Sequence, residues 1–308
     1  MAKCTFVFIL SLLIFSNFLA AAEPIDIIKL NSGHNASDQR HLYNWEVIDA
    51  ALEASKIKYG RSKVKITGSA IPNHQRLKSL VQGRFLNVAM SLTNQEWEDS
   101  VIPIRIPIRR GIFSYRLLMI NKDKKETFKR ISTVNRLKEM RVGVRKSWTT
   151  RIILKHLNFN TVDAFSYDAV FAMLDKGRFD YIPRGINEIY YELKVREKDL
   201  PNIMIEPDIA LYIPSPYYIF VSPKTPRIAE RLEYGLDKMV KNGKLNEIFT
   251  KHYGKYIERA QIHKKRIIQI GNPLLPIETP LHDSDLWFDF NVDTNTVSNS
   301  GSKPENKS

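Results

Sequence analysis

The stretch "YDAVFAMLDKGRFDYIPRG", residues 167–185, decides the fold of this 308-residue chain. Its first half repeats apolar residues at helical spacing and reaches Gly177, a residue that commonly ends a helix. Residues 179–182 then form a short apolar strand that runs into Arg184, and Asn187 and Glu188 begin another helix. A strand end that opens onto a helix start is where α/β proteins hold small ligands. The stretch therefore predicts a ligand site with an arginine at its mouth.

The same helix-to-strand unit occurs in the first half of the chain. An amphipathic helix there ends at Gly83 and is followed by Arg-Phe, as the second helix is at Gly177. Strands and helices alternate around both units, which predicts mostly parallel sheets flanked by helices. The strands of the first half are expected at residues 25–30, 64–71 and 84–92, with helices at 43–57 and 73–83. Two similar lobes follow from this repetition.

Two proline-punctuated extended segments, residues 101–111 and 209–223, connect the halves. Proline removes a backbone donor, so the first of these segments is not expected to form a central strand. The chain is expected to leave lobe one, build lobe two and return, and two crossings make a hinge. We assign residues 23–112 and 217–275 to lobe one and residues 113–216 to lobe two. The last helix is expected to end at Gly254.

The N-terminus reads as a secretory signal peptide, residues 1–22. Lys3 precedes an apolar run at 6–19, which is short for a membrane anchor and ends in three alanines. Cleavage after Ala22 removes the only cysteine, Cys4, and lowers the formal net charge from +14 to +13. A mature chain without cysteine has no disulfide and no thiolate, and it suits a bacterial periplasm. Export argues against a nucleic-acid partner despite the basic charge.

The C-terminal extension, residues 276–308, carries prolines and apolar side chains up to about residue 290. That part is expected to lie along the body without regular structure. From about residue 291 the chain is polar and lacks aromatic residues, so we expect disorder there.

The segment "MVKNGKLNEIFTKHYG", residues 239–254, resembles the closing element of the amino-acid-type periplasmic solute-binding proteins, family 3. Further landmarks follow in the order of that family: "LKSLVQGRFLNVAMSLT", "PIRRGIFSYRLLMI", "RVGVRKSWTT" and "SPYYIFVSPKTPRIAERL". The resemblance covers the mature chain up to about Tyr256. It implies the two-lobed α/β type 2 periplasmic-binding-protein fold, joined by two hinge strands. It also implies a small solute in the cleft, enclosed by hinge closure.

The family's pattern for α-amino acids has three polar anchors, and this chain departs from two of them. Glu96, Trp97 and Glu98 stand where the family places an arginine that grips the carboxylate. Arg184 and Gly185 stand where an aspartate holds the ammonium. The middle anchor, a hydroxyl residue at a helix start, is kept in Ser147 and Thr149. The resemblance therefore implies an anionic or acceptor-rich solute in place of an α-amino acid in the usual pose.

The candidate ligand-binding residues are those expected near this cleft. They are Arg184, Ser147, Trp148, Thr149, Arg110, Ser91, Thr93, Glu188, Tyr217 and His34. A structural role is open for several of them. Arg184 is as well explained by an ion pair with Glu188 one turn on, Trp148 by packing, and His34 by a polar loop.

Other function classes are weighed against binding. Glu98 or Glu188 could act as an acid or base on this fold, but the chain contains no nucleophile elbow, zinc motif or phosphate loop. We therefore expect no catalysis, no metal and no cofactor. A sensing or interaction module with a degenerate site is the main alternative. The expected partners are a small solute and either a membrane permease or a periplasmic sensor domain, and the chain is expected to be monomeric.

Overall fold

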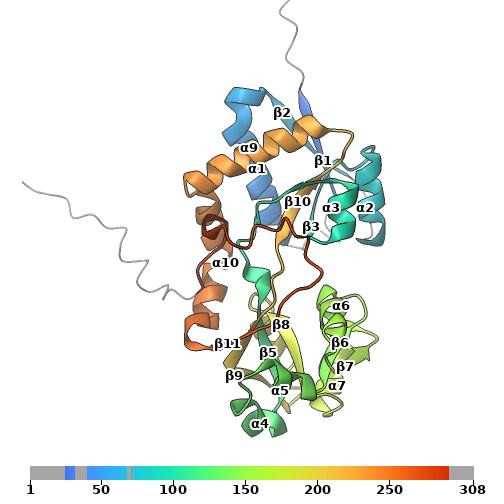
Figure 1. Ribbon diagram of the computed structural model, residues 1–308, viewed down its shortest axis with the longest axis vertical. Coiled ribbons are helices and arrows are strands. Elements are labelled where there is room, and N and C mark those ends of the chain that lie inside the picture. The colour runs from blue at the N-terminus through green and yellow to red at the C-terminus, as the bar shows by residue number, and fades with distance from the viewer. Residues whose placement is uncertain (1–24, 32–39, 68–70, 72, 291–308) are drawn as a thin grey trace, which may run out of the picture.

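The computed structural model describes residues 25–31, 40–67, 71 and 73–290, which form two lobes stacked along the long axis (Figure 1). Lobe one contains a parallel pair, β1 (Asp26–Leu30) and β2 (Ser62–Ile66). Beside it, β10 (Tyr217–Val221) lies between β3 (Val88–Leu92) and β4 (Ile102–Ile104). The helices of lobe one are α1 (Arg40–Tyr59), α2 (Asn73–Gln82), α3 (Gln95–Ser100), α9 (Pro226–Lys241) and α10 (Lys244–Ala260).

Lobe two is built on one six-stranded sheet of order β11-β9-β5-β8-β6-β7. Its strands are β5 (Tyr115–Asn121), β6 (Val142–Arg145), β7 (Thr161–Ala164), β8 (Tyr181–Gly185), β9 (Ile203–Tyr212) and β11 (Arg266–Gln269). Its helices are α4 (Lys125–Lys129), α5 (Val134–Glu139), α6 (Thr149–His156), α7 (Tyr167–Asp175) and α8 (Ile189–Lys194). Single 3₁₀ turns lie at Ile112–Ser114, Lys122–Lys124, Ile262–Lys264 and Ser284–Leu286.

In each lobe, one strand runs against its neighbours. β5 is antiparallel to both β8 and β9, whereas β6 is parallel to β7 and β8. β10 is antiparallel to both β3 and β4. Both of these strands directly follow a crossing between the lobes, so each enters its sheet from the hinge. The prediction of two α/β lobes joined by two crossings is confirmed, but the expectation of mostly parallel sheets is wrong, because the strands that enter from the hinge run antiparallel to their neighbours and make the sheets mixed.

The two glycines that end helices α2 and α7 explain the repeated sequence unit. Gly83 and Gly177 have φ of +66° and +63°, the left-handed conformation that glycine adopts at low cost. The phenylalanine two residues later differs between the lobes, because Phe179 is fully buried and Phe85 is 61% exposed. Phe179 packs over Gly143, where a Cβ would come within 2.2 Å of its ring.

The last third of the chain departs from the sequence prediction in two places. The helix end expected at Gly254 is wrong, because α10 continues to Ala260 and buries Ile257 and Ala260. This extra turn carries the chain to lobe two, where β11 pairs in parallel with β9. Residues 266–269 therefore belong to the lobe-two sheet, although the sequence placed them in lobe one.

The crossings are held together by backbone contacts and by the segment after β11. Ser114 joins them, since its carbonyl accepts from Ile213 N at 2.8 Å and its Oγ accepts from Ser215 N at 3.0 Å. Residues 271–290, dark red in Figure 1, then run from lobe two back to lobe one, mostly without regular structure as expected. Asn272 donates to Pro214 O at 2.8 Å, and the Phe290 ring lies 4.4 Å from that of Tyr115.

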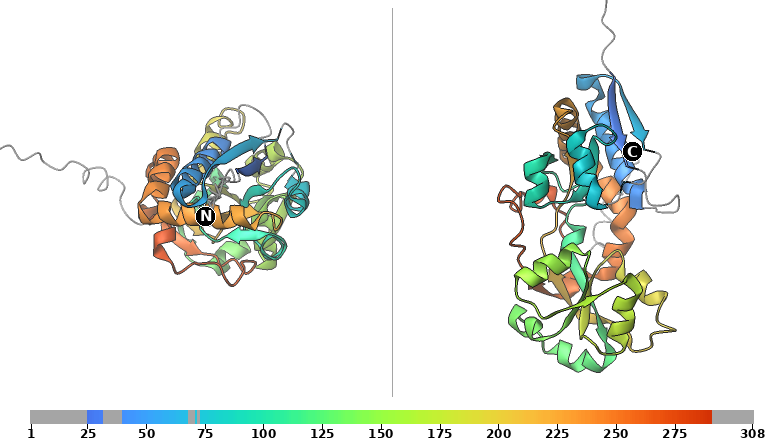
Figure 2. Two further views of the ribbon diagram at one scale, coloured as in Figure 1. Left: turned by 90° about the horizontal axis from the view of Figure 1, so that it is seen from above. Right: turned by 90° about the vertical axis from the view of Figure 1, so that its right-hand side faces the viewer.

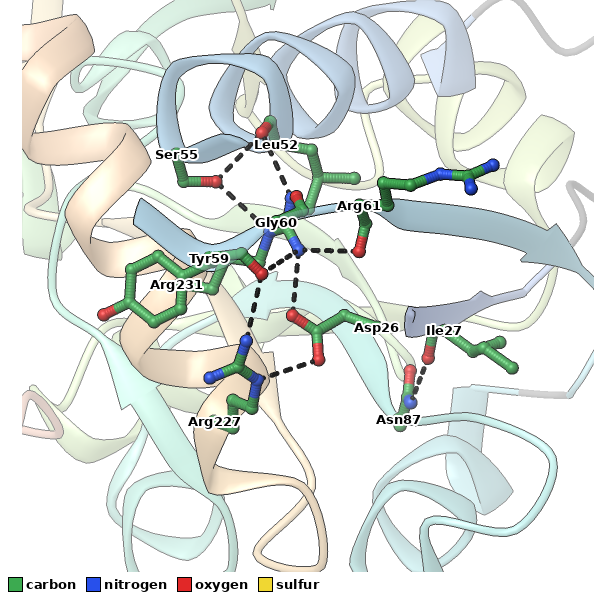
Figure 3. A network of polar contacts seen from close by, with 10 residues as sticks. All are labelled: Asp26, Ile27, Leu52, Ser55, Tyr59, Gly60, Arg61, Asn87, Arg227 and Arg231. Carbon is green, nitrogen blue, oxygen red and sulfur yellow. Dashed lines mark hydrogen bonds and ion pairs between the residues drawn. The ribbon is translucent and has the colours of Figure 1, made fainter. Parts of the chain in front are cut away.

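A buried arginine fixes the far end of lobe one (Figure 3). Arg231 of α9 is fully buried, and its Nη1 lies 2.8 Å from Asp26 Oδ2 at the start of β1. Its Nη2 donates to Gly60 O at 2.8 Å, and Arg227 Nε lies 3.2 Å from Asp26 Oδ1. These bonds tie β1, the turn from α1 to β2, and α9 into one unit. Within the described ranges, no helix is long and apolar enough to span a membrane.

Candidate functional site

A cavity of about 850 Å³ lies between the lobes, and side chains of both lobes line it. Its volume is in the range of ligand-binding clefts. Lobe one supplies Tyr43, Leu92 and Arg109, and α10 supplies His252, Tyr253 and Tyr256. Lobe two supplies the remaining wall, namely Arg116, Arg145, Ser147, Trp148, Thr149, Thr150, Tyr167, Arg184, Asn187, Glu188, Tyr191 and Glu192.

Arg184 lies in this cavity at the end of β8, but its charge is engaged within the protein. Its Nε donates to Glu192 Oε2 at 2.8 Å, and its Nη2 also contacts Glu192 and lies 2.6 Å from Glu188 Oε2. Its guanidinium stacks over Trp148 at 4.3 Å from the ring centroid. Burial opposes the charge, but the hydrogen bond to Glu192 and both carboxylates outweigh it and raise the pKa of Arg184. The pairing with Glu188, open from the sequence, is therefore present and is joined by Glu192.

Glu192 is held as firmly as its partner. It is 1% exposed, and it also accepts a hydrogen bond from the hydroxyl of Tyr167. Burial, with the hydrogen bond and charge of Glu192, raises the pKa of the Tyr167 hydroxyl. Arg184, Glu192 and Tyr167 thus form one polar cluster that shapes the lobe-two wall.

Arg116 differs from Arg184, because its guanidinium is not fully hydrogen-bonded within the described residues. It lies on β5, directly across the sheet from Gly185. A Cβ at Gly185 would stand 3.5 Å from Arg116 Nη1, so the glycine leaves room for the guanidinium. Its buried Nε has no hydrogen-bond partner in the described part of the chain. Burial lowers the pKa of Arg116 even though Glu188 and Glu192 act against that shift. An anion in the cavity would satisfy this donor and offset the desolvation.

Arg109 supplies the corresponding cation from lobe one. It is 5% exposed, and its guanidinium is surrounded by aromatic rings. Phe113 and Tyr217 lie 4.7 Å away, and Tyr43 and Tyr253 lie 5.4 and 5.7 Å away. Its Nη2 donates to the side chain of Asn44 at 3.1 Å. Stacking of this kind stabilises a guanidinium and fixes its orientation.

The start of α6 contributes backbone donors to the same cavity. Trp148 is its N-cap residue, and no side chain accepts the usual capping bond there among the described residues. Ser147, Thr149 and Thr150 line the cavity beside this helix end, and Arg145 precedes it. A helix N-terminus with uncapped N–H groups attracts negative charge. Ser147, Trp148 and Thr149 therefore line the cavity at a helix start, as the sequence predicts, and their role in binding stays a prediction.

Other predicted residues lie outside the cavity lining. Arg110 turns away because its φ is +43°, and it donates to Trp287 O at 2.8 Å. Thr93 donates to Glu98, and Tyr217 donates to Met90 O at 3.3 Å. Ser91 pairs with Tyr218 in the lobe-one sheet, next to Leu92, which does line the cavity. His34 lies outside the described residues.

The sequence reading missed Arg109 and Arg116. Arg116 stands alone in the apolar strand "YRLLMI", and an isolated charge in such a strand is a signal for a site. For Arg109 the adjacent pair "RR" carried no information on which arginine faces the cleft. In the described ranges, no group of three or more histidine, cysteine, aspartate or glutamate side chains could hold a metal ion.

No family model matches the chain, and no curated protein matches it. One similar solved structure is AbpA, an amino acid ABC transporter substrate-binding protein from Streptococcus pneumoniae bound to L-arginine. The identity is 17%, the coverage is 70% of this chain and 85% of that chain, and the TM-score is 0.44. Another is the ancestral amino acid-binding protein AncCDT-1, a precursor of cyclohexadienyl dehydratase, with 14% identity, 75% and 94% coverage, and a TM-score of 0.49.

A third is a histidine kinase sensor domain with similarity to periplasmic binding proteins. It shares 16% identity over 68% of this chain and 84% of that chain, with a TM-score of 0.44. Amino-acid-binding proteins, the class that the sequence resembles, are thus among the structures similar to this chain. At these identities and TM-scores the similarity does not indicate what the chain binds or does.

Proposed function

We propose that this protein captures a small anionic solute between its lobes and encloses it by hinge closure. The observation that carries the proposal is Arg116, a cation at the base of the cavity whose buried Nε has no hydrogen-bond partner in the described residues. The internal carboxylates do not remove the need for an anion, because Glu192 and Glu188 already contact Arg184. A carboxylate or phosphate of the solute would supply the acceptors that the protein leaves out.

Arginines on both walls of the cavity explain why a bound anion would favour hinge closure. Arg109 lines the cavity from lobe one, whereas Arg116 and Arg145 line it from lobe two. A solute that carries negative charge contacts both walls, so it binds the closed form more tightly than the open form and shifts the population toward closure. Trp148 and Tyr191 on lobe two, with Tyr43 and Tyr256 facing the same cavity, offer ring surfaces to the rest of the solute.

The contacts of Glu98 and Glu188 favour solute binding over catalysis. Glu98 does not line the cavity and pairs with Arg105, at 2.8 Å from its Nη2. Glu188 does line it, but its Oε2 lies 2.6 Å from Arg184. The expected export signal supports a periplasmic location for this capture. A membrane permease or a sensor domain would receive the closed form, and the genes beside this one would separate transport from sensing.

The test is a thermal-shift screen followed by calorimetric titration of residues 23–308. The screen contains organic acids, sugar acids, phosphorylated solutes, short peptides and amino acids, because a solute that binds the folded form raises its melting temperature. Arg116→Gln should weaken the anionic solute by roughly 10- to 150-fold, the range for a hydrogen bond to a charged group. Arg136→Gln is the matched control, since Arg136 is exposed and pairs only with the surface residue Glu139 at 3.1 Å.

If Arg116→Gln and wild type bound the anionic solute with equal affinity, Arg116 would not be its partner and the proposal would fail. A screen in which only neutral or cationic solutes bind would also reject the anionic class. No binding by any solute would favour the sensing or interaction module that docks without a ligand.

A further inference from the structure

Among the described residues, no helix covers the outer face of the β1–β2 pair, which is unusual for parallel strands. Parallel sheets normally have helices on both faces. The register sets Ile27 beside Lys63 and Lys29 beside Lys65, so these four side chains share one face. On β1 the alternate residues Asp26, Ile28 and Leu30 are buried on the other face.

Large apolar side chains are exposed together with these lysines. Ile25 is 48% exposed, and Ile27 is 36% exposed. The loop after α2 borders the same face, because Lys29 Nζ donates to Arg84 O at 2.8 Å. Phe85 in that loop is 61% exposed, with the Arg84 guanidinium 5.1 Å from its ring. We call this surface the basic–apolar face: Ile25, Ile27, Lys29, Lys63, Lys65 and Phe85.

The positive charge of this face is not neutralised by its own strands. Asp26 is the only acid on β1 and β2, and it points inward to Arg231 and Arg227 (Figure 3). The exposed acid Glu53 on the neighbouring helix pairs with Lys56 at 3.1 Å. Lysine on an edge strand also discourages strand pairing, which accounts for Lys63 and Lys65. It does not account for exposed isoleucine and phenylalanine beside them.

We propose that the basic–apolar face docks on an anionic lipid surface. Lysines interleaved with large apolar residues are the composition of interfacial membrane contacts, where the apolar groups enter the headgroup region and the cations pair with lipid charge. The face lies at the end of lobe one farthest from lobe two, where the described chain begins (Figures 1 and 2). The apolar run of the expected signal, residues 6–19, ends six residues before Ile25, so that signal would bring the start of β1 close to a membrane.

This docking is independent of the solute. The cavity lies between the lobes, whereas β1 and β2 lie at the opposite end of lobe one. A protein held at the membrane by this face would keep its cleft accessible and would stay close to a membrane partner.

The experiment is vesicle co-sedimentation of residues 23–308 with phosphatidylcholine, with and without phosphatidylglycerol, at low and physiological salt. Wild type should bind the anionic vesicles and not the neutral ones, and binding should weaken with salt. Lys63→Glu/Lys65→Glu should reduce the partition coefficient at least ~10-fold. Phe85→Ser should reduce it without any change of charge. Far-ultraviolet circular dichroism of each variant checks that the fold is kept.

The matched control is Lys176→Glu/Lys198→Glu, which makes the same change in net charge on exposed positions of lobe two. Equal losses in the two double variants would mean that only net charge matters, and the proposal would fail. It would also fail if wild type ignored anionic vesicles. A dimer that Lys63→Glu/Lys65→Glu dissolves in sedimentation equilibrium would assign the face to a second copy of the chain instead.

Discussion

Replacing Glu192 by glutamine tests whether the cleft wall depends on a buried ion pair. Glu192 is 1% exposed and contacts Arg184 through Nε and Nη2. Removing one partner of a buried pair typically costs about 3–5 kcal/mol, because the other charge is left without compensation. Glu188 remains 2.6 Å from Arg184 and takes up part of that charge, so the lower end is expected. A loss of about 3 kcal/mol corresponds to a melting temperature lower by roughly 6–12 °C.

The assay is urea unfolding of wild type, Glu192→Gln, Arg184→Met and the double variant. Because the two residues are in contact, the double variant should lose less stability than the sum of the single variants. Glu139→Gln, at an exposed pair, is the control and should stay within about 0.5 kcal/mol of wild type. The pKa of the Tyr167 hydroxyl should also fall in Glu192→Gln, since burial and Glu192 together raise it. Additive losses, or a loss under about 1 kcal/mol, would refute the reasoning.

Three further predictions concern a glycine in the site, a buried carboxylate and the repeated helix end. Gly185→Ala should weaken solute binding roughly tenfold with little change in stability, because its Cβ would stand 2.9 Å from Asn187 Oδ1 and crowd Arg116. Calorimetric titration measures this, and unchanged affinity would mean that Arg116 does not need the space. Asp180→Asn should flatten the loss of stability on acidification: burial raises the pKa of Asp180, but hydrogen bonds from Arg141 outweigh it and leave the pKa lowered. A lowered folded pKa gives stability above about pH 4 that is lost as the pH falls through the folded value. Urea midpoints between neutral pH and pH 3 test this, and parallel curves for variant and wild type would contradict it. Gly83→Ala should destabilise more than Gly177→Ala, because a Cβ at Gly83 would meet Ser222 Oγ at 2.6 Å, whereas nothing lies within 4 Å of one at Gly177. Equal urea midpoints for the two variants would show that only the shared left-handed φ matters.

Much of the fold could be predicted because local patterns and tertiary packing agree. Helical spacing before Gly83 and Gly177, and apolar strands after them, specify the same units that the structure contains. The prediction failed at Gly254, where burial of Ile257 and Ala260 carries α10 past a residue that usually ends a helix. β11 was missed for the same reason, since its place in the lobe-two sheet depends on that extra turn.

Part of the predicted residue set lines the cavity, because a strand end beside a helix start is set by chain order. Arg184 does lie in the cavity, but Glu192, two helical turns along, engages its charge. Which arginine faces the cavity depends on geometry that sequence spacing does not contain. A left-handed φ at Arg110 turns that side chain away while Arg109 stays in the cleft, and the space over Gly185 admits Arg116.

The position of β10 has a consequence for the order in which the lobes are completed. β10 is the only bond partner of both β3 and β4 in that sheet, yet it comes more than 100 residues after β4 in the chain. Until residue 221 has been synthesised, β3 and β4 have no strand between them. Strands β5 to β9 of lobe two, in contrast, come from one continuous stretch that emerges earlier. Lobe two can therefore assemble first as the chain emerges, and lobe one is completed by the returning chain.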